Sequence, residues 1–153
     1  MIDLNSKGGF WIRLAALICW TGVSIGTIAE TIHPAKLSST ELTGYAFKNP
    51  DTIVTETPGG KIHDLTSLKS SDGKFASGMY SAGKSRFDIT EPYGVDEFMF
   101  FLEGSVTLTS DDGSQMIINA GEAVTIPKEW TGVWETEGYR KIWVIYSASG
   151  EGL

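Results

Sequence analysis

Histidine and cysteine are scarce in this chain of 153 residues, which contains two histidines and one cysteine. A single cysteine, Cys19, excludes an internal disulfide bond. The histidines, His33 and His63, supply few of the nitrogen ligands that transition metals prefer, and a tight site for such a metal generally needs about three or four converging ligands. The scarcity of both residue types therefore argues against a metal centre.

Basic residues are also few, because 12 lysines and arginines stand against 19 aspartates and glutamates and give a net charge of −7. Nucleic acids and anionic membrane surfaces are bound by clusters of positive charge. The composition therefore excludes nucleic acid as an expected partner. Apolar residues make up 41% of the sequence, which is enough for the core of one domain.

The apolar segment near the N-terminus is short for a membrane-spanning helix, which needs roughly 20 residues. This stretch, "LAALICWTGVSIGTIA", covers residues 14–29 and follows Lys7 and Arg13. Such a pattern is typical of a secretory signal, so we predict a signal peptide in residues 1–29, cleaved after Ala29, and a periplasmic or secreted protein. Two alternatives stay open: a helix of the folded domain in a cytoplasmic protein, or an uncleaved anchor, which would be the only contact with a membrane.

From Phe75 onward the sequence consists of short runs typical of β-strands, with glycine-containing clusters between them. Short strands at this spacing predict an all-β sandwich or barrel, and no helical period competes with them. The clusters at Gly83, Gly104 and Gly138 predict turns between separate strands. The expected strands are "FASGMYSAG", "SRFDIT", "DEFMFFLEG", "SVTLTS", "QMIINA", "EAVTIP", "TGVWETE" and "RKIWVIYSA".

The preceding residues are more polar. We expect short strands at "YAF" and "TIVTE", residues 45–47 and 52–56, and a loop or a single helical turn at "HDLTSLKSSDGK", residues 63–74. We see no second domain. The predicted organisation is a signal peptide or apolar segment in residues 1–29, an extension with strands that join the barrel in residues 30–74, and the barrel in residues 75–149.

The run "EFMFFL" contains an acid within an apolar strand. Alternation places Glu97, Met99 and Phe101 on one face and Phe98 and Phe100 on the other. Both faces are mostly apolar, so we expect this strand to be buried on both sides. A buried carboxylate requires a partner, a metal or a raised pKa, and this makes Glu97 the first candidate for a functional residue.

Two spacings around this strand resemble the motifs of the cupin superfamily, whose members have an RmlC-like jelly-roll barrel. Glu97 is followed by six residues and Gly104, and Gly121 is followed by five residues and Pro127. The resemblance implies a single cupin barrel behind the N-terminal apolar segment. The later stretch "IPKEWTGVWETEGYRKIWVIY" is similar to the ureidoglycine aminohydrolase-like and ethanolamine-utilisation-like branch of that superfamily, although Glu129 stands where the branch usually has glycine.

The departures from a metal cupin are specific. Two histidines are expected shortly before the glutamate, where this chain has Thr90–Tyr93, and a third is expected where it has Gly132. Only Glu97 remains of the four usual ligands. The resemblance therefore implies a cupin that has lost its metal histidines, and we expect no metal and no other cofactor.

The resemblance also indicates which side chains would meet in the barrel. We predict Glu97 and Tyr93 as candidate catalytic residues, and the expected ligand-binding residues are Arg86, Met99, Phe101, Trp134 and Tyr146. The structural alternative for Glu97 is an ion pair with Arg86 or a bond to a backbone amide, and that for Trp134 is core packing. Arg140 and Lys141 are expected at a solvated strand edge.

Two classes of function follow from these residues. The favoured one is a non-metal cupin that binds a small organic molecule or serves as an accessory protein. The alternative is a small hydrolase, lyase or isomerase that uses Glu97 with Tyr93 or Arg86; the missing histidines argue against a ureidoglycine aminohydrolase reaction. The expected partners are a small-molecule ligand and a second copy of the chain, because cupins of this kind often form homodimers.

Overall fold

The computed structural model describes residues 33–153. The chain divides into two units, Met1–His33 and Pro34–Leu153, and the predicted signal peptide lies outside the described residues, so it stays a prediction. No helix in the described part of the chain is long and apolar enough to cross a membrane. The elements are α1 (Ser39–Leu42), the 3-10 helix η1 (Tyr45–Lys48), β1 (Ile53–Thr57), β2 (Gly60–Lys69), β3 (Phe75–Ile89), β4 (Asp96–Ser110), β5 (Gln115–Asn119), β6 (Ala123–Ile126) and β7 (Gly132–Tyr146).

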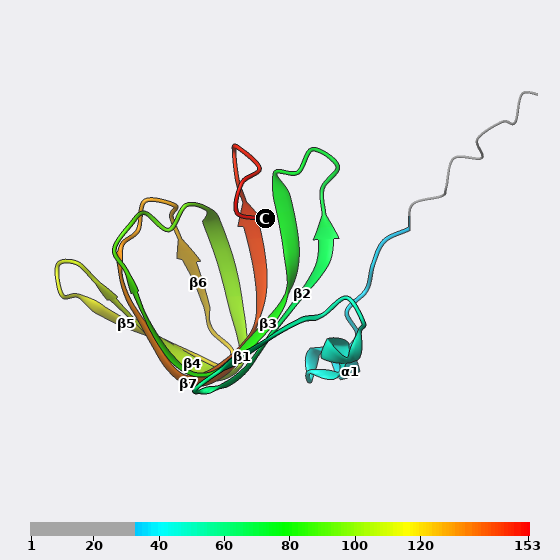
Figure 1. The fold of residues 1–153 in the computed structure, drawn as a ribbon, viewed down its shortest axis with the longest axis horizontal. Coiled ribbons are helices and arrows are strands. Elements are labelled where there is room, and N and C mark those ends of the chain that lie inside the picture. The colour runs from blue at the N-terminus through cyan, green and yellow to red at the C-terminus, as the bar shows by residue number, and fades with distance from the viewer. Residues whose placement is uncertain (1–32) are drawn as a thin grey trace, which may run out of the picture. The chain divides into compact units, whose positions relative to one another are not determined.

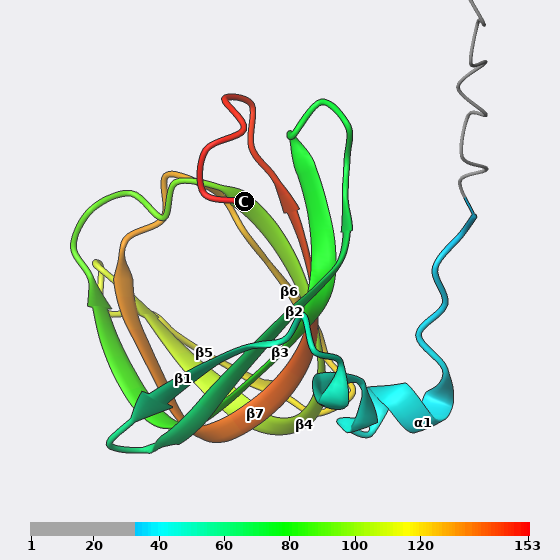
Figure 2. The ribbon, with the colours of Figure 1, turned by 45° about the vertical axis from the view of Figure 1, so that its right-hand side comes forward.

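The strands form one antiparallel sheet in the order β1-β2-β3-β7-β4-β5, and β6 pairs with the first half of β4. Strands β3, β4 and β7 have 15 residues each and curve strongly, so the sheet rolls around a central interior (Figures 1 and 2). The loops and the C-terminal segment gather at the open end of this roll (Figure 1). The prediction of an all-β barrel is therefore confirmed.

The curvature is concentrated where three glycines lie side by side on the central strands. Gly83 of β3 pairs with Gly138 of β7, which in turn lies opposite Ser105, the residue after Gly104 of β4. Gly104 has φ +71°, and a Cβ there would lie 2.0 Å from the carbonyl oxygen of Gly138. The prediction of turns at these glycines is wrong: the strands continue through them and bend, because backbones approach here more closely than side chains allow.

The bend also shifts the alternation of inward and outward side chains. Before the bend in β7, Trp134 and Thr136 are buried in the interior; after it, the buried residues are Tyr139, Lys141 and Trp143. The register between β4 and β7 changes at the same level, between Phe101 and Glu103 and between Ser105 and Thr107. A strict alternation of inward and outward residues across Gly138 therefore assigns the wrong face to the residues of β7 that follow Gly138.

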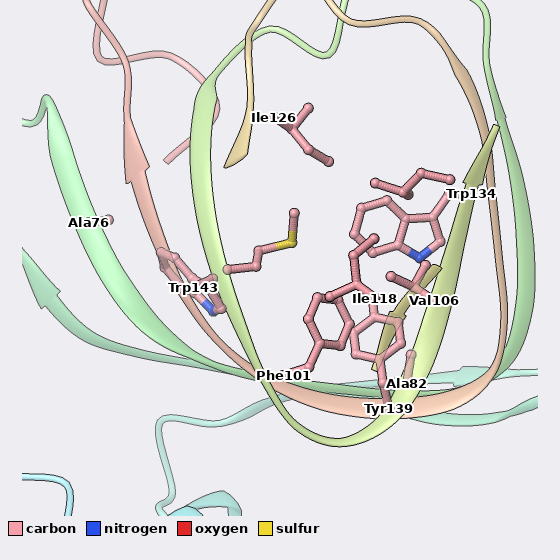
Figure 3. Packing of buried hydrophobic residues seen from close by; sticks show 11 residues of the cluster. Ala76, Ala82, Phe101, Val106, Ile118, Ile126, Trp134, Tyr139 and Trp143 are labelled. Carbon is pink, nitrogen blue, oxygen red and sulfur yellow. The ribbon is translucent and has the colours of Figure 1, made fainter. Parts of the chain in front are cut away.

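The interior contains the main hydrophobic core. Met99, Phe101 and Val106 of β4 are almost completely buried, together with Ile118, Ile126, Trp134 and Tyr139 from the surrounding strands. Figure 3 labels Phe101, Val106, Ile118, Ile126, Trp134 and Tyr139, and shows their side chains directed toward the interior of the barrel. The predicted inward face of Glu97, Met99 and Phe101 is confirmed, since all three are buried.

The outer face of β4 differs from the prediction. Phe98 is 43% exposed and Phe100 is 36% exposed, so the strand is buried on one side only. The outer layer formed by α1 and η1 covers a neighbouring area instead, where Ala46 packs with Leu65 and Met79 (Figure 2). The expected homodimer stays a prediction.

The segment before the barrel also departs from the prediction in two places. Residues 63–69, expected as a loop or helical turn, form most of β2, which pairs with both β1 and β3. Residues 45–47, expected as a strand, form a 3-10 helix. The strand expected at residues 52–56 is confirmed as β1. The polar residues of β2 have a weak local preference for a strand. The segment nevertheless forms a strand because it pairs with β1 and β3.

We predict that Gly104→Ala destabilises the fold more than Gly113→Ala does. Both glycines have positive φ, +71° and +82°, but a Cβ at Gly113 meets nothing within 4 Å. The control should lose about 1 kcal/mol from its left-handed backbone alone, and Gly104→Ala about 3 kcal/mol because it also forces β4 away from β7. Urea unfolding measures both, and equal losses would show that the close approach of the strands is unimportant.

Candidate functional site

A cavity of about 800 Å³ occupies the open end of the barrel. Its walls are mainly aromatic and aliphatic side chains from β3 and β7, from the loop before β4 and from the C-terminal segment. Trp134 and Tyr139 project into the interior from β7 (Figure 3). The polar side chains deep in the cavity are few: Asp64 of β2, Glu97 of β4 and Lys141 of β7, with the Tyr93 hydroxyl beside them.

The centre of the cavity is an ion pair between Glu97 and Lys141. The Nζ of Lys141 donates to Oε1 of Glu97 over 2.7 Å, and each residue is only 5% exposed. The Tyr93 hydroxyl donates to the other carboxylate oxygen, Oε2. Lys141 also contacts the sulfur of Met99 at 2.8 Å. Both oxygens of the buried carboxylate therefore have a donor, which is what a carboxylate in an apolar interior requires.

Aromatic rings surround the ammonium group of Lys141. Its Nζ lies 5.1 Å from the ring centre of Trp134, 5.5 Å from that of Tyr80 and 5.9 Å from that of Tyr139. These separations are within the range of cation–π attraction. Burial nevertheless lowers the pKa of Lys141, while the charge of Glu97 and its hydrogen bond oppose this effect. The lysine therefore gives up its proton more readily than a lysine in water.

Two tyrosines of the cavity remain hydrogen-bond donors across the physiological pH range. Burial raises the pKa of Tyr93, and the negative charge of Glu97 raises it further. Burial is also the main cause that raises the pKa of Tyr139. A phenol that cannot ionise keeps its proton for a hydrogen bond, so Tyr93 stays oriented toward Glu97.

Three polar atoms of the cavity make no hydrogen bond of normal geometry within residues 33–153: Oδ1 of Asp64 and the indole nitrogens of Trp134 and Trp143. Burial raises the pKa of Asp64, and this effect is opposed first by a loose contact of the Trp143 indole N–H with the carboxylate and then by the charge of Lys141. The Trp134 indole makes a similar loose contact with the Tyr139 hydroxyl. Buried polar atoms usually have a partner, since leaving one unpaired costs about 1–3 kcal/mol. One acceptor and two donors thus face a cavity large enough for a small molecule.

The structure brings three predicted site residues together. Glu97, Tyr93 and Trp134 all line the cavity. Met99 faces the same interior and contacts Lys141. Phe101 is 0% exposed and belongs to the core rather than to the cavity lining. The roles assigned to these residues stay predictions.

Two predicted site residues lie elsewhere, and this corrects the expectation for them. Arg86 is exposed and forms ion pairs with Asp88 at 3.0 Å and Glu135 at 2.6 Å. Its neighbour Phe87 takes the inward position on β3, so Arg86 points outward and cannot pair with Glu97. Tyr146 is 49% exposed, because it follows the inward-facing Ile145 by one residue.

Four residues of the cavity were missed by the sequence reasoning. Lys141 was expected at a solvated edge, and this was wrong because the bend at Gly138 moves it to the interior. Tyr139 and Trp143 were missed for the same reason, and the sequence signal was Gly138 itself, a glycine within a strand, which often marks a bulge. Asp64 was missed because its segment was expected to be a loop.

The residues present do not fit the metal site of a cupin. Within residues 33–153 no group of three or more histidine, cysteine, aspartate or glutamate side chains converges. The ammonium of Lys141 already occupies Oε1 of Glu97, and a second cation at that oxygen would be repelled. The expected absence of a metal stays a prediction.

The comparisons with known proteins agree with this architecture. Residues 69–143 match the model of the EutQ-like cupin domain. These residues form a cupin domain of the EutQ-like branch, and the resemblance to ethanolamine-utilisation-like cupins is confirmed. It matches no curated protein.

Solved structures show the same fold at low identity. The EutQ protein of Clostridium difficile is 22% identical, with a TM-score of 0.52 over 64% of this chain and 77% of that protein. Ectoine synthase from P. lautus is 17% identical, with a TM-score of 0.54 over 75% and 78%. A protein of unknown function from Rhizobium leguminosarum is 21% identical, with a TM-score of 0.51 over 77% and 99%. At these identities the likeness concerns the fold alone.

We expect strong coupling between Glu97 and Lys141 in a double-mutant cycle. Lys141→Met alone leaves a buried carboxylate without its cation and should lower the free energy of unfolding by about 3–5 kcal/mol, and Glu97→Gln alone should have an effect of similar sign. The double variant should be more stable than Lys141→Met, because neither charge is then left unpaired. Urea unfolding of the four proteins tests this, and additive losses would contradict direct pairing.

Asp64→Asn should stabilise the protein at neutral pH. The folded pKa of Asp64 is raised above its unfolded value, so its contribution to stability is fully present below about pH 4 and is lost as the pH rises through the folded pKa. The variant avoids this loss, so its advantage should appear at pH 7 and vanish below about pH 4. Thermal unfolding between pH 3 and 8 checks this, with the exposed Asp51→Asn as control; destabilisation at pH 7 would mean that Asp64 has a structural partner.

Proposed function

We propose that the protein binds a small organic molecule inside the barrel, against the Glu97–Lys141 pair. The observation that carries this proposal is a cavity of about 800 Å³ whose wall contains a buried ion pair and three polar atoms without a hydrogen bond of normal geometry. Small-molecule sites are typically cavities of about 300–1,000 Å³ with apolar and aromatic walls and a few polar groups. A purely structural interior would instead be filled by side chains and would pair its polar atoms.

The chemistry of the lining indicates the class of ligand. The rings of Tyr80, Trp134 and Trp143 favour a flat or apolar body. The deep part of the cavity contains two carboxylates, Asp64 and Glu97, against the single ammonium of Lys141, so a further negative charge is disfavoured. We therefore propose a neutral or cationic ligand with a hydrogen-bond donor for Oδ1 of Asp64 and an acceptor for an indole N–H.

Acid–base catalysis is the second candidate, and a specific contact favours it. Tyr93 donates to one oxygen of Glu97 while Lys141 donates to the other. A carboxylate held between a phenol and an amine can accept and return a proton within a desolvated site. We propose an isomerase or lyase reaction, in which Glu97 moves a proton between two positions of a bound molecule. Arg86 takes no part, because it lies outside the cavity.

The similarity to ectoine synthase is compatible with catalysis in a barrel of this kind. At 17% identity it concerns the fold, and its reaction is not transferred to this chain. Fold and chemistry are separable in superfamilies with many functions. The proposal therefore rests on the cavity of this chain rather than on its relatives.

We expect benzylamine and benzyl alcohol to bind, and benzoate to bind much more weakly. Binding should quench tryptophan fluorescence, because Trp134 and Trp143 line the cavity. Asp64→Asn should weaken benzylamine binding about tenfold, through loss of a hydrogen bond between charged groups worth about 1.5–3 kcal/mol. Titrations followed by fluorescence and by thermal shift give both affinities.

The matched control for these titrations is Arg86→Gln. Its exposed side chain lies outside the cavity, so its affinity for benzylamine should equal that of the unmodified protein. Trp143→Phe tests the location directly, since it should remove much of the quenching. Benzylamine binding that is unchanged in both Asp64→Asn and Trp143→Phe, or no binding of any of the three compounds, would refute the proposed site.

A further inference from the structure

Lys141 differs from every other lysine in the described part of the chain. The lysines of residues 33–153 are exposed, except Lys141, which lies inside the barrel and lines the cavity. A lysine placed only to pair with Glu97 would not need to face an open space. Its amine instead stands at the wall where a bound molecule would meet it, 5.1–5.9 Å from three aromatic ring centres.

The partner of Lys141 is also suited to take its proton. The 2.7 Å contact from Nζ to Oε1 of Glu97 is a direct path for a proton. In an interior of low dielectric the ionic pair loses solvation that the neutral pair does not need. The lowered pKa of Lys141 agrees with this geometry. The amine at the wall of the cavity therefore gives up its proton more readily than an exposed lysine does.

We propose that Lys141 is a covalent binding site for small aldehydes or ketones, with which it forms an imine. This inference rests on the proposed function, because the carbonyl compound must first enter the same cavity. A desolvated lysine in an apolar pocket is the form of this side chain that acts as a nucleophile toward carbonyl groups. The preferred compounds are uncharged, since Asp64 and Glu97 disfavour a carboxylate next to the amine.

The reaction balances with the groups that the cavity supplies. Lys141 transfers a proton to Glu97, and the free amine attacks the carbonyl carbon; a proton moves from the nitrogen to the carbonyl oxygen to give a carbinolamine. Glu97 then returns its proton to the hydroxyl group, which leaves as water while the nitrogen lone pair forms the C=N bond. The product is a protonated imine beside the Glu97 carboxylate, and one water is released without any oxidant or reductant.

The surroundings of Lys141 stabilise the product. The protonated imine keeps the positive charge at the position where Glu97 and the rings of Trp134, Tyr80 and Tyr139 already hold an ammonium. Tyr93 keeps Glu97 oriented through its second oxygen. Water, which hydrolyses an imine, competes less well in a cavity with mostly apolar walls.

The experiment uses the full chain with benzaldehyde as the probe and sodium cyanoborohydride to trap the imine as a stable secondary amine. Intact mass then counts the adducts, and peptide mapping locates them. We expect Lys141 to be modified severalfold faster than Lys69, an exposed lysine at the mouth of the same cavity. Lys141→Arg should abolish the fast adduct, because it keeps the positive charge beside Glu97 but forms no imine, and Lys69→Arg should leave it unchanged.

Glu97→Gln separates the role of the proton acceptor from that of the amine. It retains Lys141 but removes the carboxylate, so trapping at Lys141 should become several times slower. Peptide mapping of the adducts on the protein without substitutions does not depend on the stability of any variant. It therefore tests the proposal even if Lys141→Arg is unstable. Adducts spread equally over the exposed lysines, or trapping at Lys141 no faster than at Lys69, would overturn the proposal.

Benzyl alcohol distinguishes this failure from failure of the proposed function. It has the same ring but no carbonyl group, so it tests entry into the cavity alone. Quenching of tryptophan fluorescence by benzyl alcohol without an adduct at Lys141 would leave the binding function standing and reject the imine. Absence of both would reject the binding function as well.

Discussion

The bend shared by β3, β7 and β4 is the constraint on which the rest of the structure depends. Gly83, Gly138 and Gly104 lie side by side at this level, and the strands are too close there to admit a Cβ on Gly104. Without the bend the sheet would remain open and one of its faces would be exposed. With it, the two halves of each long strand face the same interior, and a cavity remains at the open end.

The same bend determines the chemistry of the cavity. Because the alternation shifts at Gly138, Lys141 of β7 enters the interior and meets Glu97 on the neighbouring strand β4. A buried ion pair is rarely the most stable way to fill a core, since apolar side chains of similar volume often do as well or better. This ion pair lies at the wall of a cavity, beside an oxygen of Asp64 that makes no hydrogen bond of normal geometry. A role in binding or catalysis explains this position better than a contribution to stability does.

The chain shows how a cupin barrel can keep its architecture while its interior changes character. The glutamate of the first motif remains at Glu97, but its neighbours are a lysine, a tyrosine and aromatic rings instead of metal-binding histidines. An ammonium beside the carboxylate supplies positive charge where a metal cupin holds its ion. The chemistry that we propose for this site uses its own side chains, in agreement with the general separation of fold from function.

The sequence by itself determined the fold class, most strands, the inward face of Glu97, Met99 and Phe101, and the family, because these depend on local alternation and on two motif spacings. The tertiary structure alone decided that Lys141 and Asp64 join Glu97 while Arg86 and Tyr146 do not. The reason is physical: a bulge reverses the side-chain phase without changing composition, and the polar strand β2 forms only through pairing with β1 and β3. Lys141, which the sequence pattern assigns to the surface, therefore lies in the interior. Arg86 and Tyr146, which were expected in the cavity, lie on the surface.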